Sequence, residues 1–482
     1  MRSQEHRAIG DEATAAALVN VGGEAADEGF LLTFGDVVAL SGDYFRPDGS
    51  RGARPPDALF SLTPVAGRGG TRVQTRDEVV CALKVMAVDE DFVDTRFQPG
   101  GAFSRYSFSP RADRTDVERR VRDRYLCLAA TNDDHFVSPG RSDVPTGSGA
   151  GAAPAAYRAL HQRALDEAWR LGRYGGDLSR AMAREAAAQH YLTDAFAAGH
   201  LRTPVADIRR YWRRRYPQFW ERLQHRVAAD TAAALREVSA LLRLVPRRVL
   251  HERTDSELRG RTSQYPELSL GDLVARAFHD WDNDHGLRVD GGVVFGDGHV
   301  DEGVTRDLAL DASRAGVDDV DIAFRLGRAG RSAPGPSLYE EVRRATGSPG
   351  RAFGAETRIP RLSEVNPPQN WMAADVETLW ESPMVGTSGP TVGDAVVEML
   401  RPDGEFVRQL EGLGEGLAGT HGILAAPVLG RWLAGRCCHA YHRGFVEPLA
   451  RDPRPVVLAL TEGEGVHRQP AMAALSLSPL PW

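Results

Sequence analysis

The chain has 482 residues, 42% of them hydrophobic, which is enough for a large core or for two domains. Its formal net charge of −7 gives it no general attraction to nucleic acid or to an anionic membrane. The four cysteines, Cys81, Cys127, Cys437 and Cys438, show no CxxC spacing, which argues against a disulfide framework and a zinc ribbon.

The N-terminal segment MRSQEHRAIGDEATAAALVNVGG carries charges where a signal peptide needs an apolar core. No run of about 18 apolar residues, the length that a membrane-spanning helix needs, occurs along the chain. We therefore expect a cytoplasmic location for the chain as written, with a specialised export route as the alternative.

Helical periodicity dominates the chain, and breaks rich in glycine, proline and serine interrupt it. In chain order we expect a candidate strand at 31–40, helices at 155–173, 178–199, 220–245 and 422–450, a tight turn between strands at 293–300, and a candidate strand at 454–460. Polar and apolar residues alternate only weakly in the candidate strands, so the sequence predicts a mainly α protein. A ligand-bearing region is expected over about 1–290, and a further, mainly helical region over 291–482.

The stretch AAAQHYLTDAFAAGHLRTP places three potential metal ligands, His190, Asp194 and His200, in an apolar helical run. His190 and Asp194 are four residues apart, so on a helix they share one face and can hold one cation. His200 lies about 280° around an ideal helix from His190, and it faces a neighbouring direction unless the helix bends at Gly199. The alternative is a buried core histidine, a solvent-facing aspartate and a histidine that meets the helix dipole.

Histidines and carboxylates recur beside other helix-forming segments. EHRAIGDEA contains His6 and Asp11, FGDVVALSGDYF contains Asp36 and Asp43, TNDDHFVSPG contains His135, and AFHDWDNDHGL contains His279, Asp280, Asp282, Asn283, Asp284 and His285. Neutral imidazoles and carboxylates together are what a buried multi-zinc site needs, because the cations offset the carboxylate charge.

The spacing H-x3-D-x5-H of His190, Asp194 and His200, with His6, an upstream aspartate and His135 in this order, resembles the zinc-dependent phospholipase C and P1 nuclease family. The resemblance covers roughly residues 1–290 through four or five short motifs. It implies a multi-helix zinc-binding core, to which this chain adds a helical C-terminal region.

The resemblance also implies a ligand set for two or three Zn2+ ions. His135, His190 and Asp194 would hold one zinc with an upstream aspartate. We prefer Asp43 for that role because its SGDYF setting combines a turn with aromatic residues; Asp36 is the competitor. Asp194 would bridge to a second zinc that His6 helps to hold.

His200 would bind a third zinc together with a later histidine, for which we prefer His279 over His225. This choice implies an insertion over about 205–270. The chain departs from the family in two places: residue 1 is Met where the family has a metal-binding Trp, and the residue four after His279 is Asn283 where the family has a carboxylate.

By this resemblance the protein is a zinc-dependent phosphodiester hydrolase, most simply a phospholipase C-type enzyme. Asp43 would orient or deprotonate the attacking water, and Asp194 would hold the metals. A P1-type nuclease or another phosphoesterase is the alternative within the family. The two departures favour a further alternative, a non-catalytic helical protein that metal stabilises.

The segment RRYWRRRYPQFWERL at 209–223 interleaves arginines with aromatic residues. This mixture suits transient contact with a membrane surface, where rings lie at headgroup level, and it also suits single-stranded nucleic acid. The third interpretation of this segment is an amphipathic helix that packs against the rest of the protein. The acidic net charge makes a phospholipid or another small phosphodiester the preferred substrate over nucleic acid.

Overall fold

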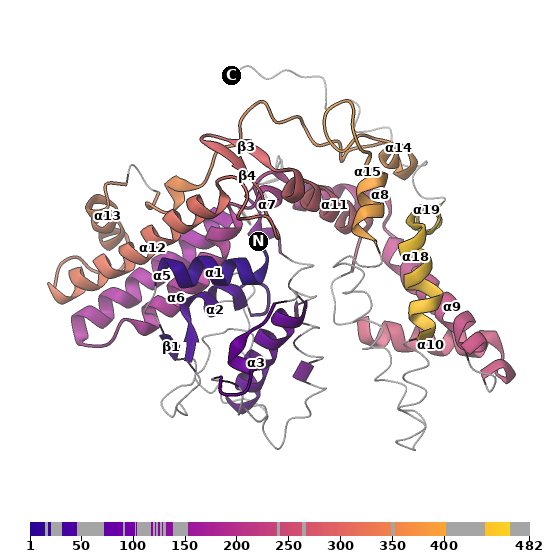
Figure 1. Cartoon of the computed structure of the whole chain (residues 1–482), viewed down its shortest axis with the longest axis horizontal. Coiled ribbons are helices and arrows are strands. Elements are labelled where there is room, and N and C mark those ends of the chain that lie inside the picture. Colours follow the sequence, from indigo (N-terminus) through magenta and orange to yellow (C-terminus); the bar gives the residue numbers. More distant parts are fainter. Residues whose placement is uncertain are drawn as a thin grey trace. The chain divides into compact units, whose positions relative to one another are not determined.

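The structure is a computed structural model. It describes residues 1–14, 18–20, 31–45, 72–89, 92–101, 103, 117–118, 121, 124–125, 128, 132–137, 153–238, 242–262, 267–348, 352–401 and 439–462. The described residues form helices and two short hairpins, which confirms the mainly α class (Figure 1). No helix within the described ranges has both the length and the apolar character that a membrane crossing requires.

Contacts divide the chain into two units, Met1–Pro204 with His279–Asn366, and Val205–Phe278 with Pro367–Trp482. The division therefore does not fall near residue 290. The segment 279–366 belongs with the N-terminal residues because it contains α12 (Thr305–Arg328), which packs along α5 (Ala153–Tyr174) and α6 (Ser179–Asp194).

Two glycines explain how closely α5 and α12 approach each other. A Cβ atom on Gly172 of α5 would collide with the carbonyl oxygen of Phe324 on α12. A Cβ atom on Gly327 of α12 would collide in the same way with the carbonyl oxygen of Trp169 on α5. The two backbones touch because neither glycine has a side chain.

The remaining elements of the first unit are short helices and hairpins around this core. They are α1 (Ser3–Ala13), β1 (Leu18–Asn20), β2 (Leu31–Thr33), α2 (Phe34–Leu40), α3 (Arg72–Asp89), η1 (Thr95–Phe97), η2 (Asp133–His135), α7 (Ala198–Arg202), the end of α11 (Leu270–His285), β3 (Leu287–Val289), β4 (Gly292–Val294), α13 (Pro336–Ala345) and η4 (Glu356–Arg358). β1 pairs antiparallel with β2, Val19 opposite Leu32, and β3 with β4, Arg288 opposite Val293.

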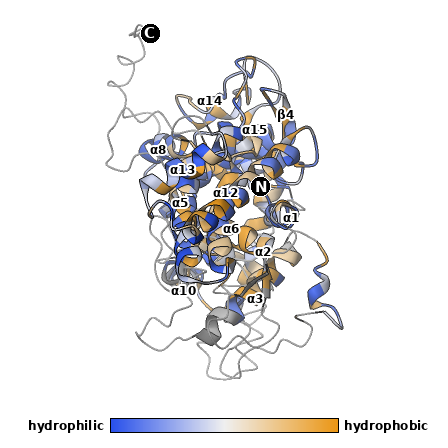
Figure 2. Ribbon diagram, turned by 90° about the vertical axis from the view of Figure 1, so that its left-hand side faces the viewer, coloured by the Kyte–Doolittle hydropathy of each residue, from blue (hydrophilic) through white to orange (hydrophobic). Residues whose placement is uncertain are grey.

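Helix α6 is the central element of the first unit. Its residues from Ala181 to Asp194 are buried, apart from the partly exposed Arg184, because α1, α2, α5 and α12 all contact it. Alanines make up much of this helix, and their small side chains let four neighbours approach. In Figure 2, orange, hydrophobic stretches occur along α12, which packs against α6, and along α3. The polar residues in the second half of α6 are therefore buried in the core: Glu185, Gln189, His190, Thr193 and Asp194.

The candidate strand at 31–40 is wrong beyond its third residue. Only Leu31–Thr33 is a strand, and α2 follows immediately. The cause is a capping box: the Thr33 hydroxyl accepts a hydrogen bond from the Asp36 amide, and the Asp36 carboxylate accepts one from the Thr33 amide. The candidate strand at 454–460 is also wrong, since it lies in α19 (Pro453–Thr461), which begins with proline.

The second unit is helical in its described residues. It contains α8 (Val205–Arg215), α9 (Phe219–Val238), η3 (Leu242–Leu244), α10 (Arg247–Thr262), the beginning of α11, α14 (Val376–Trp380), α15 (Val392–Met399), the π-helix η5 (His442–Val446), α18 (Glu447–Arg451) and α19. Of the helix expected at 422–450, residues 439–450 are helical, and 422–438 lie outside the described residues.

The aromatic residues of 209–223 largely face inward in the second unit. Trp212, Tyr216 and Phe219 are buried, and the Trp212 indole donates to the carbonyl of Trp371 at 3.1 Å. The Tyr211 hydroxyl donates to the carbonyl of Ala373 at 2.6 Å. These aromatic side chains therefore pack inside the second unit, as the third interpretation of the segment predicts. A membrane-surface contact of this segment stays a prediction, and it would depend on the arginines.

Candidate metal centre

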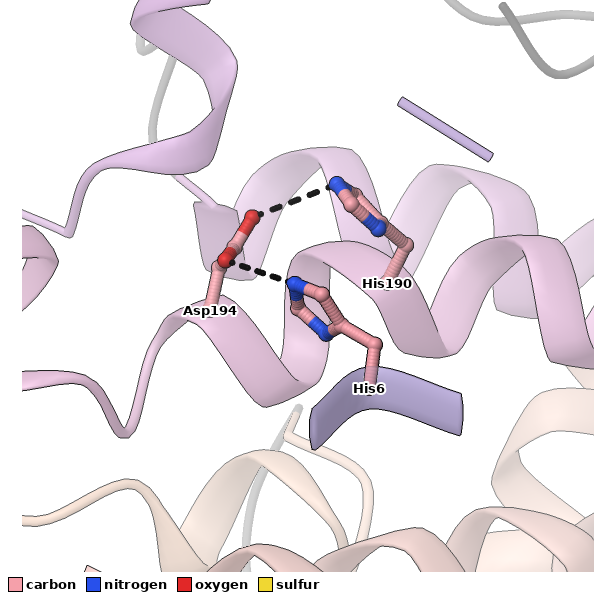
Figure 3. A group of neighbouring side chains, drawn as sticks. All are labelled: His6, His190 and Asp194. Carbon is pink, nitrogen blue, oxygen red and sulfur yellow. Dashed lines mark ion pairs between the residues drawn. The ribbon is translucent and has the colours of Figure 1, made fainter. Parts of the chain in front are cut away.

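The last turn of α6 supplies the first two predicted ligands. His190 and Asp194 lie on one face of the helix, and the His190 Nε2 atom is 3.4 Å from the Asp194 Oδ2 atom (Figure 3). Both side chains are at most 1% exposed. Their relation is the i, i+4 pair that the spacing predicts.

The helix expected at 178–199 is interrupted, and this interruption places His200. α6 ends at Asp194, a tight turn follows in which the amides of Ala195, Phe196 and Ala197 donate to the carbonyls of residues 192–194, and α7 then begins. The turn brings His200 Nδ1 to 3.2 Å from Asp194 Oδ1. A continuous helix would have directed it elsewhere.

The two carboxylate oxygens of Asp194 face two different sets of donors. Oδ1 lies 3.2 Å from His6 Nε2 and 2.9 Å from the Met1 amino group, both at the beginning of the chain, in addition to His200. Oδ2 lies 2.7 Å from His135 Nδ1, which η2 supplies, in addition to His190. Asp194 therefore has the position of a bridging carboxylate between two groups of ligands.

Asp43, rather than Asp36, lies with the histidines. Asp43 is on the turn after α2, and together with His135 and His190 it forms a group whose ligand atoms lie within 4.8 Å of one another. Asp36 is fully buried in a separate ion-pair network, where the guanidinium groups of Arg7 and Arg96 bind its carboxylate. That network and the α2 cap use both Asp36 oxygens, so it has no oxygen to offer a metal.

A third group consists of His200, His279 and Asp297. His279 comes from α11. The alternative, His225, is an exposed residue of α9 that packs against His251 in the second unit. The structure thus brings together all seven predicted ligands, His6, Asp43, His135, His190, Asp194, His200 and His279, in one place.

Asp297 is the carboxylate that the sequence reasoning missed. It lies in the turn after β4 with a positive φ of 32°, 3.4 Å from His279 Nε2 and 3.0 Å from the Met1 amino group. Asn283, four residues after His279, instead accepts the Gly199 amide through Oδ1 at 2.7 Å. The predicted turn between strands at 293–300 is wrong, because 292–294 form β4 and the strands are joined at 290–291. The signal that the sequence offered for Asp297 was the Asp-Gly pair after β4, whose position next to α11 only the β3–β4 hairpin fixes.

The buried histidines are oriented by hydrogen bonds on the side away from the centre. The His190 Nδ1–H group donates to the Val38 carbonyl at 3.0 Å, and His279 Nδ1 is 2.7 Å from the Asp280 carboxylate. Each ring therefore turns its Nε2 lone pair toward the centre. Partners of this kind fix the tautomer and orientation of metal-binding histidines.

Electrostatics favour a cation among these groups. Burial lowers the pKa of the His190 imidazole well below its ordinary 6.5, and it lowers the pKa of His200 to about 4, so both rings are neutral at pH 7. Burial alone would raise the pKa of the Asp194 carboxyl, but the adjacent Met1 ammonium holds it well below 3.8. An ionised carboxylate among neutral imidazoles is a donor set that Zn2+ accepts.

One buried atom of the centre, His6 Nε2, forms no hydrogen bond with any described residue. An unsatisfied buried polar atom costs about 1–3 kcal/mol, so the residues present fit a metal that would satisfy it. His190 takes part in two candidate groups, one with His6 and Asp194 and one with Asp43 and His135. Because only its Nε2 atom is available, it can bind a metal in one of them. The donor set therefore suits two ions.

A second buried cluster shows what distinguishes this centre. His161 of α5 contacts Glu185 through Nδ1 at 2.6 Å and Asp319 through Nε2 at 3.4 Å, and all three are fully buried. Burial alone would lower the pKa of His161, but the two carboxylates raise it to about 10. Because the carboxylates lie on opposite sides of one charged ring, this cluster is a structural ion pair, whereas the donors around Asp194 converge.

Asp297→Asn is expected to lower the zinc content by one ion per chain, because His200 and His279 alone leave a tetrahedral shell half filled. The measurement is metal analysis after dialysis. Asp301→Asn, which changes an exposed carboxylate four residues later, is the matched control and should keep the full zinc content. An unchanged count in Asp297→Asn would show that Asp297 is not a ligand.

The chain was compared with family models, with curated proteins and with solved structures, and none of them matches it. The geometry of this centre and the sequence motif that predicts it are therefore the basis of the function proposed below.

Proposed function

We propose that this protein is a zinc-dependent phosphodiester hydrolase. The observation that carries the proposal is the convergence of four histidines, His6, His135, His190 and His200, on the two oxygens of one buried aspartate, Asp194. A purely structural zinc needs four ligands in a closed shell, and this centre gathers more donors than that around one carboxylate.

The reaction needs a nucleophile and a way to offset phosphate charge. Zinc held by these residues would supply both, because bound zinc lowers the pKa of water and offsets charge on phosphate oxygens. Asp194 would be one of the residues that hold the ions. The buried imidazoles would fix their positions, since their rings are packed inside the core.

Asp43 is the best-placed residue to accept the proton of the attacking water. Its side chain is 24% exposed, in contrast to the buried His190, and its Oδ1 atom is 3.8 Å from His190 Nε2. The Ser3 hydroxyl donates to its other oxygen, Oδ2, at 3.3 Å. One carboxylate oxygen is thus held while the other faces the centre, as a general base requires.

We prefer a phospholipid or another small phosphodiester as substrate. The net charge of −7 opposes the binding of a long polyanion. Three aromatic side chains of 209–223, Trp212, Tyr216 and Phe219, are buried and therefore not free to stack on bases. P1-type nuclease activity is the alternative. If the test shows it, the substrate in the proposal changes to nucleic acid, and the hydrolysis of a phosphodiester stays.

The test is metal content and turnover measured on the same samples. We expect two or three zinc ions per chain and hydrolysis of a chromogenic phosphodiester. Chelation should abolish the activity, and zinc, but not magnesium, should restore it. His225→Ala, an exposed histidine outside the centre, is the matched control and should behave as the unmodified chain does.

Two substrates then separate the alternatives. Faster hydrolysis of a short-chain phosphatidylcholine than of single-stranded DNA would support the phospholipase C-type reaction, and the reverse order would indicate a nuclease. One zinc or none, without turnover on any phosphodiester, would overturn the catalytic proposal and leave a metal-stabilised helical protein.

A further inference from the structure

A buried threonine touches the one ligand histidine of α1. The Thr193 Oγ1 atom lies 2.6 Å from His6 Nδ1, and neither residue is exposed to solvent. Thr193 precedes Asp194 on α6, and His6 Nε2, the other ring nitrogen, faces Asp194 Oδ1 at 3.2 Å. Thr193 and Asp194 therefore contact opposite sides of the same imidazole ring.

The direction of the Thr193–His6 hydrogen bond follows from counting protons. The Thr193 hydroxyl has one proton, and its oxygen lies 2.7 Å from the Gln189 carbonyl and 3.0 Å from the His190 carbonyl. In the structure the hydroxyl donates to these carbonyl oxygens, which can only accept. The Thr193 oxygen then accepts from His6, and His6 must carry a proton on Nδ1.

A neutral His6 with its proton on Nδ1 has a bare lone pair on Nε2. Two further observations agree with this state. His6 Nε2 forms no hydrogen bond with any described residue, and the ring is wedged 4.3 Å, centroid to centroid, from His190, so that it has little room to turn over. In water the opposite tautomer of histidine, with the proton on Nε2, is the favoured one, so the protein has to impose this state.

We propose that Thr193 is a positioning residue that sets the tautomer of His6 and so prepares Nε2 as a zinc ligand. The inference rests on the proposed metal centre, and it adds a role that the motif H-x3-D-x5-H does not contain, since Thr193 stands at one of its variable positions. The same helix turn then supplies a ligand, Asp194, and the group that orients another ligand.

The test uses two variants of Thr193 and one matched control. Thr193→Val keeps the shape but removes the hydroxyl, and Thr193→Ser keeps the hydroxyl. Thr254→Val is the control, because the Thr254 hydroxyl donates to the carbonyl four residues earlier at 2.8 Å in α10 and forms no hydrogen bond with a described histidine. Thr254→Val thus reproduces the loss of the helical hydrogen bond alone.

The first readout is the tautomer of His6 in zinc-free protein, from two-bond 1H–15N correlation spectra of histidine-labelled chains, assigned with His6→Gln. We expect the Nδ1–H tautomer in the unmodified chain, in Thr193→Ser and in Thr254→Val. Thr193→Val should shift to Nε2–H, which can donate to Asp194. An Nε2–H tautomer in the unmodified chain would overturn the inference, whether or not the valine variant folds.

The second readout is zinc affinity, from competition with a chromophoric chelator. Loss of a partner that orients a metal ligand typically weakens binding by about 10–100-fold, and we expect this loss at one zinc in Thr193→Val, with recovery in Thr193→Ser. Equal zinc affinities in Thr193→Val and Thr193→Ser would overturn the inference. Neither readout depends on hydrolysis, so tautomer control with no phosphodiester turnover would reject the proposed function alone.

Discussion

Replacing Asp194 with asparagine should remove zinc from the centre and lower phosphodiester hydrolysis by about three orders of magnitude or more. The carboxylate contacts donors through both oxygens, with His6 and His200 on one side and His135 and His190 on the other. The neutral amide keeps the shape but loses the negative charge and one acceptor oxygen. Metal ions contribute several kcal/mol to such reactions, and each 1.36 kcal/mol is a factor of ten in rate.

Asp319→Asn is the matched control for Asp194→Asn. Asp319 is an equally buried aspartate of the same helical core, and it pairs with His161 rather than with the centre. We expect this variant to lose stability in urea unfolding but to keep its zinc and its rate. If Asp194→Asn keeps both zinc and hydrolysis while it remains folded, the bridging role of Asp194 is wrong.

Gly42→Ala should disrupt the centre without changing any ligand. Gly42 has a positive φ of 87°, and a Cβ atom there would lie closer than 3.0 Å to ring atoms of both His190 and His135. The left-handed backbone costs an L-residue about 1–2 kcal/mol, and overpacking in a rigid core adds about 1–3 kcal/mol. Since the two rings would have to move apart, we expect zinc content and hydrolysis to fall together.

Gly175→Ala separates the backbone effect from the steric one. Gly175 has a φ of 82°, but no atom lies within 4 Å of the Cβ position. The Gly175→Ala variant should therefore lose free energy of unfolding only through backbone strain, and it should keep its zinc. Urea unfolding of the zinc-free proteins and metal analysis of the loaded ones make the comparison. Equal losses in the two variants would mean that Gly42 has no special relation to the histidines.

The sequence alone was informative where the residues that act together lie within one short segment. The four-residue spacing of His190 and Asp194 determines that they share a helix face, because the period of the helix is fixed by local geometry. The mainly α class follows for the same reason. The candidate strand at 31–40 failed on equally local grounds, since the Thr33–Asp36 capping box outweighs the apolar character of the run.

The membership of the centre depended on contacts between segments far apart in the chain. Asp36 and Asp43 lie at the two ends of one apolar run, and the α2 cap together with the ion pairs to Arg7 and Arg96 separates Asp36 from the histidines. Asp297 offered no spacing signal, because it reaches His279 through a hairpin and a turn rather than along a helix. Sequence patterns cannot specify such contacts, since each depends on how several elements pack together.

The sequence by itself thus determined the helical class, the ligand pair of α6 and the residue types around it. Only the tertiary structure decided which carboxylates join the histidines, that α6 ends at Asp194 so that His200 turns back toward it, and that Thr193 contacts His6. The physical reason is the same in each case. Helix periodicity is set within a few residues, whereas a metal centre needs donors from separate elements to meet within a few ångströms of one point.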